Sequence, residues 1–302
     1  MSKKVLAVYF TQSGQMEDII SHFTEPLLSS PEITLEKLRI RPAAAYPFPW
    51  TTPTFFNVMP ESVTTTPVEL EPLVFKEVRY DLIIIGYQPW FLSPSIPINS
   101  VLQHPDFKAR LKNTPVITIS GCRNMWINAQ EKIKKLLSAS SANLVGNIAL
   151  VDRHNNYASL VTIFYWMLTG KKDRKWGIFP RPGVSDKDIE GAAVFGETVK
   201  KHFENNALDT LQPALIAQQA VNIQYSLMFI ERKAGKIFSI WSKIIHGSKK
   251  RKTLLVAFKY YLLIALCVAA PIILLVDAIF FKPFLGKRIR NQVEYYQSVR
   301  SL

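Results

Sequence analysis

Short apolar segments alternate with amphipathic segments along the first 206 residues. The apolar segments are 5–10, 33–40, 81–86, 115–120 and 144–151. Apolar residues at helical spacing lie between and after them, at 15–28, 96–112, 126–140 and 185–206. Nearly continuous apolar runs are typical of strands buried on both faces of a parallel sheet. The pattern therefore predicts a doubly wound α/β fold with a five-stranded parallel sheet.

The turn after the first strand is a candidate anion site. It reads Thr11, Gln12, Ser13, Gly14 and Gln15, and an amphipathic helix follows it. Such a turn directs hydroxyls, backbone N–H groups and a helix N-terminus at one point. It contains no lysine or arginine, and the chain has neither the Lys-Ser/Thr pair of a P-loop nor a G-x-G-x-x-G sequence here. An ordinary strand–helix turn and a phosphate site built from neutral donors both remain open.

Two further loops carry aromatic, amide and basic side chains where strands end. Gln88, Pro89, Trp90 and Phe91 follow the third strand. Ser120, Gly121, Cys122, Arg123 and Asn124 follow the fourth. Ligands of open α/β sheets bind at the carboxyl ends of the strands, and aromatic planes with amides suit a flat heteroaromatic ring. The alternative is that the aromatic residues cap the sheet and the amides close turns.

Two insertions enlarge this domain. Residues 42–72 contain seven prolines and five aromatic residues, a composition that predicts a lid docked on the domain. Residues 154–184 contain the apolar run 158–168 and then a basic stretch at 171–175. We expect the second insertion to be either a buried packing helix or a flap that receives an apolar substrate.

The positive charge of the chain is concentrated at its end. The net charge is +14, and residues 207–302 hold 14 Lys/Arg against 4 Asp/Glu, a net charge of +10. These basic residues flank an apolar run, so they favour a membrane surface and not nucleic acid as partner. The two cysteines, Cys122 and Cys267, lie in different contexts and are not expected to form a disulfide. The start of the chain leads straight into a strand, which predicts a domain on the cytoplasmic face of the inner membrane.

The apolar run 260–281 is long enough to span a bilayer, with Asp277 as its one charged residue. Pro271 leaves a re-entrant hairpin open as an alternative. Upstream, residues 237–245 show an interfacial-helix pattern, although such a stripe also suits packing on the protein itself. We therefore divide the chain into a domain at 1–206, a basic linker with an amphipathic helix at 207–252, and a hydrophobic membrane segment with a basic tail at 253–302.

Residues 11–15 are similar to the FMN-phosphate loop of flavodoxins, T/S-x-T-G-x-T, and depart from it at Met16. With the other two loops, the chain resembles the flavodoxin and NAD(P)H-quinone-reductase superfamily over residues 3–206. The resemblance implies that residues 11–15 hold the phosphate of FMN, that residues 88–91 flank its isoalloxazine ring, and that residues 120–124 meet the pyrimidine edge. It implies no metal site.

The combination of this domain, its insertions and the basic-flanked tail resembles the bacterial dialkylresorcinol biosynthesis proteins of flexirubin-type pigment pathways, often labelled dialkylresorcinol condensing enzymes. These are flavodoxin-like partners of a ketosynthase. The resemblance implies FMN-dependent aromatisation of a lipid-like dialkyl-cyclohexane-1,3-dione to a resorcinol. A membrane-associated NAD(P)H-quinone reductase, and an electron carrier or scaffold for the ketosynthase, are the alternatives.

Three residues are candidates for the chemistry. Arg123 would stabilise the negative charge of reduced flavin, and His154 or Tyr157 would remove a proton or hold the dione oxygens. The alternative is that Arg123 pairs with a surface carboxylate and His154 caps a turn. A condensing nucleophile would require Cys122 activated by His154, and nothing in the sequence indicates that the two are adjacent.

Overall fold

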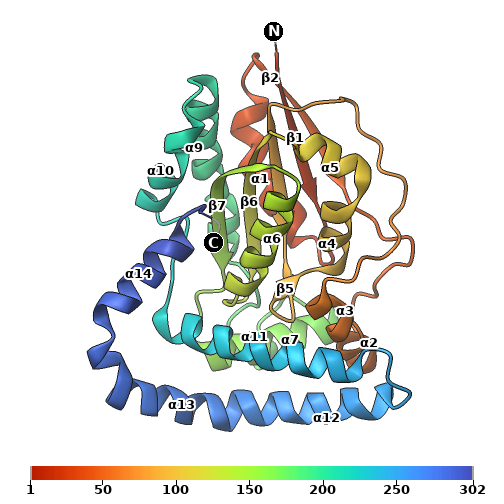
Figure 1. Ribbon diagram of the computed structural model, residues 1–302, viewed down its shortest axis with the longest axis vertical. Helices are drawn as coiled ribbons and strands as arrows, with labels where there is room; N and C mark the ends of the chain where they lie inside the picture. Colours follow the sequence, from red (N-terminus) through yellow and green to blue (C-terminus); the bar gives the residue numbers. More distant parts are fainter. Residues whose placement is uncertain (1, 301–302) are drawn as a thin grey trace.

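The computed structural model describes residues 2–300, and its centre is one parallel sheet of five strands (Figure 1). The strands are β1 (Lys3–Tyr9), β2 (Ile33–Arg39), β3 (Leu82–Tyr87), β6 (Pro115–Cys122) and β7 (Asn143–Val151). Their order is β2-β1-β3-β6-β7. This is the flavodoxin-like order, in which the chain reverses its direction of growth beside β1. The predicted fold class is confirmed.

Helices cover both faces of the sheet because its central strands are apolar on both faces. In β1, Val5 and Ala7 face one helical layer, and Leu6 and Val8 face the other. The first layer contains α1 (Gln15–Leu28), α8 (Asp186–Glu190), α9 (Ala192–Glu204) and α10 (Leu211–Ala217). The second contains α4 (Ile96–Gln103), α5 (Pro105–Leu111) and α6 (Ile127–Ala139). The carboxyl ends of all five strands point to the lower edge of the molecule in Figure 1.

Two predicted helices are interrupted. The segment 96–112 divides at His104, whose backbone is extended because a residue that precedes proline is disfavoured in the helical region. The segment 185–206 divides at Gly191, between α8 and α9. Both interruptions leave the apolar faces of the helices on the sheet, so the periodicity predicted the layer correctly and missed the break.

Both insertions pack beneath the strand ends. Residues 42–72 form α2 (Thr52–Asn57) and α3 (Met59–Thr64), and their Trp50, Phe56 and Met59 are buried. The segment is docked on the domain, as predicted, and we call it the lid. Residues 154–184 contain α7 (Asn156–Thr169) and a short 3-10 turn, η1 (Lys175–Gly177). Only three side chains of α7 are buried, which favours a flap over a core helix.

After residue 206 the chain continues to pack on the domain through η2 (Leu208–Thr210) and α10, and then forms three long elements. These are α11 (Tyr225–Ile245), a continuous helix over Arg251–Phe284, and α14 (Gly286–Gln297). The continuous helix consists of α12 (Arg251–Ile264), η3 (Ala265–Ala269), α13 (Ala270–Val276), η4 (Asp277–Phe281) and η5 (Lys282–Phe284). Among the described residues it is the one helix that is long and apolar enough to cross a membrane.

The chain does not turn back at Pro271, so the re-entrant hairpin is wrong. The helix continues through this proline, and the five residues before α13 are π-helical. A proline inside a helix removes one backbone hydrogen bond and crowds the carbonyl four residues earlier. The wider π-helical turn at η3 accommodates both effects, and so the helix is not broken.

Candidate functional site

The three loops predicted to form a site meet in one cavity of about 200 Å³ at the carboxyl ends of β1, β3 and β6. Ten predicted residues line it: Gln12, Ser13, Gln15, Gln88, Pro89, Trp90, Phe91, Gly121, Cys122 and Arg123. Four predicted residues, Thr11, Gly14, Ser120 and Asn124, belong to the same loops without lining the cavity. The structure therefore brings together the loops that the sequence separates by more than a hundred residues.

Both insertions also contribute to the walls of this cavity. The lid supplies Phe48, Trp50, Phe55 and Val58, and the flap supplies Ile163, Trp166, Met167 and Gly183. Three further residues of the wall were not predicted as site residues, namely Met16, Ile19 and Gly183; the first two belong to the amphipathic helix predicted at 15–28. The polar side chains of the cavity come from the strand loops, which also supply Pro89, Trp90 and Phe91, whereas the insertions add apolar and aromatic side chains.

The turn after β1 presents the start of α1 to this cavity. Gly14 has a φ of 91°, a left-handed conformation that glycine adopts without cost, and α1 begins at the next residue. The first turn of a helix has N–H groups without intrahelical partners, which favour an anion. Glu17 in that turn is held by the Tyr9 hydroxyl and by Arg39, each at 3.2 Å. Its charge is therefore paired.

Two amides of this turn connect it to the insertions. Gln12 Nε2 donates to the carbonyl of Pro47 in the lid at 2.8 Å. Gln15 Oε1 accepts from the N–H of Val184 at 3.2 Å. Lid, flap and strand loop are thus joined around one cavity, so a ligand that enters it displaces or reorganises these contacts.

Gly183 makes a close approach that only glycine allows. Its φ is 81°, and an added Cβ would lie 2.7 Å from the Trp166 ring and 2.8 Å from Gln15 Nε2. The flap can therefore pack on the α1 turn at this position only without a side chain. This glycine fixes how far the flap lies from the predicted phosphate loop.

A strained hairpin carries the predicted ring-flanking residues. Phe91 and Leu92 connect the two short strands β4 (Pro89–Trp90) and β5 (Ser93–Pro94), and both have positive φ, 48° and 60°. A two-residue turn of this kind favours Asn-Gly, because left-handed backbone costs other residues about 1–2 kcal/mol each. The packing of Phe91 offsets that cost, since its ring centroid lies 4.8 Å from that of Phe55 in the lid.

Arg123 lies in the cavity wall and is fixed by the flap. Its Nη1 donates to the carbonyl and to Oδ1 of Asn156, at 3.0 and 2.9 Å, and Asn124 Nδ2 donates to the same Oδ1 at 2.7 Å. Burial lowers the pKa of Arg123, while Asp152 opposes that shift. Within residues 2–300 no carboxylate lies at ion-pair distance from it, so its charge is available to a ligand.

Cys122 is not activated as a nucleophile. Burial raises the pKa of its thiol well above the usual value, and Glu231 raises it further. The thiol form is therefore favoured, and only the thiolate attacks carbonyl carbon at a useful rate. Cys122 therefore does not meet the requirement for a condensing nucleophile.

His154 and Tyr157 line a second, larger cavity of about 790 Å³. The structure does not place them in the cavity that contains Arg123, and their catalytic roles stay predictions. The backbone N–H of His154 donates to Asp152 Oδ1 at 2.9 Å. This second cavity also contains Glu231, which caps α6 by accepting from the Asn128 N–H at 2.7 Å. Burial raises the pKa of Glu231 to about 7.

Glu231 was missed by the sequence analysis, although a signal exists. It is the single acidic residue in the basic amphipathic helix α11. A lone carboxylate in a basic helix indicates a specific hydrogen-bond partner, which here is the backbone N–H of Asn128 at the start of α6.

Several buried polar atoms of the predicted site have no hydrogen-bond partner within residues 2–300. They include Thr11 Oγ1, Gln15 Nε2 and Asn124 Oδ1. Buried polar groups are nearly always satisfied, by protein, water or ligand. Of the three residues only Gln15 lines the cavity, and its unpartnered Nε2 fits a polar ligand such as FMN. A cavity of about 200 Å³ is below the roughly 300 Å³ of small ligand sites, so the lid or flap has to shift to admit the ring.

No protein-family model matches the sequence, and no curated protein matches it. Solved structures do match. A flavoprotein from Lactobacillus acidophilus NCFM, in complex with FMN, has 16% identity and a TM-score of 0.38, covering 49% of this chain and 93% of that chain. A putative flavoprotein from Bacteroides eggerthii DSM 20697 has 18% identity and a TM-score of 0.40, covering 57% and 100%. A flavodoxin from the domain Archaea has 10% identity and a TM-score of 0.37, covering 67% and 99%.

These matches cover nearly the whole of each smaller protein and about half to two thirds of this chain. At such identities and TM-scores they carry no argument about function. The flavodoxin-like fold of this chain rests on its own strand order and parallel register.

Proposed function

We propose that the chain is an FMN-dependent oxidoreductase that acts on a lipid-like substrate. One observation carries the proposal: a single cavity at the strand ends takes its polar side chains from three strand loops, and the two insertions add apolar and aromatic side chains. A plain electron carrier has no need of an aromatic lid or an aliphatic flap. A cofactor ring with an apolar substrate beside it uses both sides of this cavity.

The residues around the cavity would hold FMN as the resemblance implies. Residues 11–15 and the start of α1 would bind the phosphate, residues 88–91 would flank the ring, and residues 120–124 would meet its pyrimidine edge. Bound FMN would supply a two-electron acceptor beside the apolar wall. Arg123, held by Asn156, is placed to stabilise negative charge at that edge.

We further propose that the substrate is a dialkyl-cyclohexane-1,3-dione. With FMN bound, the cofactor would supply the hydride acceptor for one ring carbon, a base would take the proton of the neighbouring carbon, and enolisation of the two carbonyls would give the resorcinol. The ring loses two hydrogens in total, and a membrane quinone would reoxidise the cofactor. The lid and flap exclude water and accommodate the alkyl chains. His154 and Tyr157, at the start of the flap, line the neighbouring larger cavity, so the proposed base is whichever of them the flap brings to the substrate when it shifts to admit the ring.

The test is anaerobic single-turnover mixing of the FMN-loaded protein with a dialkyl-cyclohexanedione. The account predicts loss of the flavin absorbance together with one equivalent of resorcinol. The variants His154→Gln and Tyr157→Phe identify the base by the slower rate. Absence of reduction by the dione, with rapid reduction by NAD(P)H and turnover of short quinones, would replace this function with a quinone reductase. Reduction by a ferredoxin reductase alone would leave an electron carrier.

A further inference from the structure

We propose that α11, the helix Arg251–Phe284 and α14 form a platform that lies in the interface of an anionic bilayer, with the long helix parallel to the membrane and not across it. Figure 1 shows α11 and the long helix side by side below the strand ends, and α14 rising back beside the domain. The proposal follows from where the long helix is fastened and from the charges at its border.

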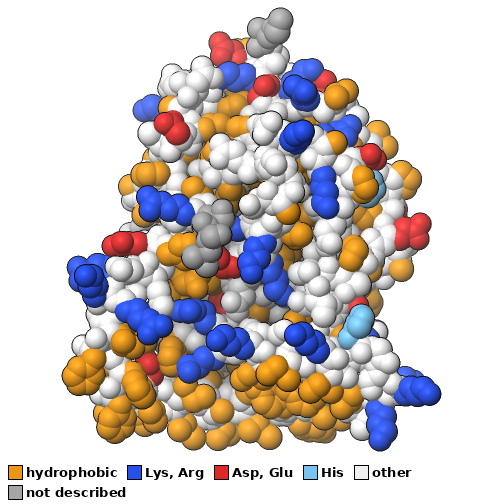
Figure 2. All heavy atoms as spheres, viewed as in Figure 1, with side chains coloured by type: hydrophobic (Ala, Val, Ile, Leu, Met, Phe, Trp, Pro, Cys, Tyr) orange, Lys and Arg blue, Asp and Glu red, His pale blue; other side chains and the backbone are white. Residues whose placement is uncertain are grey.

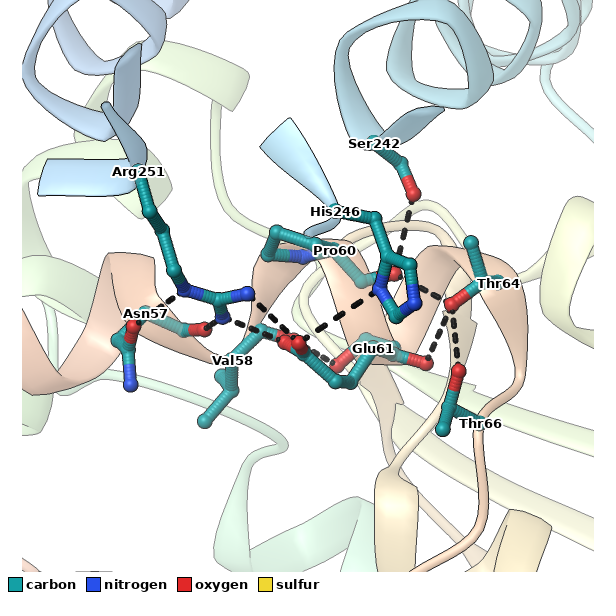
Figure 3. Close-up of polar contacts among 10 residues, drawn as sticks. Asn57, Val58, Pro60, Glu61, Thr64, Thr66, Ser242, His246 and Arg251 are labelled. Carbon is teal, nitrogen blue, oxygen red and sulfur yellow. Dashed lines mark hydrogen bonds and ion pairs between the residues drawn. The ribbon is translucent and has the colours of Figure 1, made fainter. Parts of the chain in front are cut away.

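The start of the long helix is fastened to the lid. Arg251 donates to both oxygens of Glu61, at 2.8 and 2.7 Å, and to Asn57 (Figure 3). Ser242 of α11 donates to the carbonyl of Pro60 in the same close-up, at 3.1 Å. About two turns further on, Phe258 is fully buried among aromatic residues of the lid and α11.

The far end of the helix is fastened to the same body. Asp277 is only 3% exposed and accepts from the Tyr225 hydroxyl, at the start of α11, at 3.2 Å. The chain then returns to the domain through α14. The Tyr295 hydroxyl donates to Glu131 of α6, and Gln212 of α10 donates to the carbonyl of Gln297, both at 2.7 Å.

These contacts are incompatible with a crossing helix. The 26 residues from Arg251 to Asp277 span about 39 Å at roughly 1.5 Å per residue, more than the hydrocarbon thickness of about 30 Å. A helix that crossed the bilayer would place Arg251 and α14 on opposite sides. Both are bonded to one α/β domain, so the helix lies along the surface of that domain.

The side of the long helix that faces away from the domain is apolar. Its exposed large side chains recur every three or four residues, and the inward side carries Phe258 and Asp277. The exposed members include Val256, Tyr260, Leu263, Ile264, Val268, Ile272, Ile273, Leu275, Val276, Ile279 and Phe280. Figure 2 shows this apolar surface along the lower edge of the molecule. The one acidic residue of the run is turned inward, so this surface suits hydrocarbon.

A cationic border lies directly above the apolar edge. Five basic residues of α11 and α14, Arg232, Lys233, Lys236, Lys287 and Arg288, line two adjoining cavities of about 590 and 260 Å³. None of the five has a carboxylate at ion-pair distance within residues 2–300. Figure 2 shows the band of Lys and Arg at this level. Basic residues above an apolar face complement the headgroups of an anionic leaflet.

The platform also brings the cavity close to the membrane, a consequence that deepens the proposed function and rests on it. Phe55 and Phe91 line the cavity, and the Phe91 ring centroid lies 6.3 Å from that of Phe258 in the long helix. One aromatic layer therefore separates the cavity from the apolar platform. A lipid-like substrate would enter from the bilayer through this layer.

Membrane depth tests the proposal with no flavin required. A spin label is attached to Cys267, which is exposed at the middle of the long helix. Cys122, which is half-buried, is left unchanged. Val256→Cys and Val276→Cys, each in a Cys267→Ala background, place labels near the two ends. The full chain is bound to vesicles of phosphatidylcholine with phosphatidylglycerol, and depth is read from power saturation with oxygen and a nickel chelate.

An in-plane helix predicts the same shallow depth at all three positions, about 5–10 Å below the headgroups. A crossing helix predicts a deep label at residue 267 and shallow labels at 256 and 276, and that profile would overturn the proposal. Absence of vesicle binding, or burial of the three labels in a dimer of the protein, would also overturn it. Because no outcome depends on the cofactor, failure here is distinguishable from failure of the proposed function.

The charge of the border gives a second, independent measurement. Arg232→Gln, Lys236→Gln and Arg288→Gln together should weaken binding to phosphatidylglycerol vesicles about a hundredfold, at roughly fivefold for each residue. The matched control removes three exposed lysines from the upper part of the domain, Lys108→Gln, Lys112→Gln and Lys201→Gln, and should change binding less than about fivefold. Equal losses in the two triple variants would show that net charge, and not this border, attracts the membrane.

Discussion

Gly183 gives a sharp test of how the flap meets the phosphate loop. Alanine at this position meets two separate costs. Its φ of 81° is left-handed, which costs a non-glycine residue about 1–2 kcal/mol. The added Cβ would also lie 2.7 Å from Trp166 and 2.8 Å from Gln15, and overpacking of this kind costs about 1–3 kcal/mol. The expected loss of unfolding free energy for Gly183→Ala is therefore about 2–5 kcal/mol.

Gly177 is the matched control, because its φ is 73° and nothing lies within 4 Å of an added Cβ. Gly177→Ala should lose only the backbone cost of about 1–2 kcal/mol. Thermal unfolding in detergent, followed by tryptophan fluorescence, compares the two variants. Gly183→Ala should unfold at the lower temperature and should bind flavin more weakly, because Trp166 and Gln15 are displaced. Equal melting temperatures with equal flavin affinity would refute the close approach of the flap.

Three further predictions follow from individual side chains. Arg123→Gln should slow hydride transfer by about 10²–10³-fold with flavin fully bound, as loss of an anion-stabilising donor does. The control Arg153→Gln removes an exposed arginine paired with Asp188 at 2.8 Å and should leave the rate unchanged. Equal rates in both variants would remove Arg123 from the mechanism. Burial raises the folded-state pKa of Glu231 from 4.5 to about 7. Between these pH values the folded state keeps a proton that the unfolded state loses. The free energy of unfolding should therefore fall by up to about 3 kcal/mol as pH rises through this window. Glu231→Gln should abolish that fall, measured as melting temperature at pH 5 and pH 7.5, and an unchanged slope would show that another group is responsible. Phe258→Ala should cost about 3–5 kcal/mol, because the ring is fully buried, and should expose the long helix to limited proteolysis; the solvent-facing Phe280→Ala should do neither.

The sheet and its layers were predictable because strands buried on both faces appear in the sequence as continuous apolar runs. Residues 82–85 are all apolar and fully buried, and the periodicity of α1 placed Met16, Ile19 and Ile20 on the core side. The breaks inside helices were not predictable in the same way. A single proline or glycine decides them, and the surrounding packing determines whether the helix ends, as at His104, or continues, as at Pro271.

The loops of the cavity were predictable from topology, since parallel strands end at one edge. The separation of His154 and Tyr157 from Arg123 was not, because it depends on where Asn156 fixes the start of the flap. The orientation of the long helix also could not be predicted from the sequence. Length and hydropathy indicate a membrane, whereas the contacts of Arg251, Asp277 and α14 with the domain decide the direction of the helix.

Whether the protein binds FMN decides the proposed function, and quenching of flavin fluorescence in detergent measures that binding. The account predicts one FMN per chain, an absorption band near roughly 450 nm, and weaker binding of riboflavin, because each charge-assisted hydrogen bond to the phosphate contributes about 1.5–3 kcal/mol. Ser13→Glu should abolish binding by placing negative charge against the phosphate, while Ser138→Glu, exposed on α6, should bind FMN as the parent does. Absence of FMN binding by the parent protein, or equal binding by Ser13→Glu, would contradict the account.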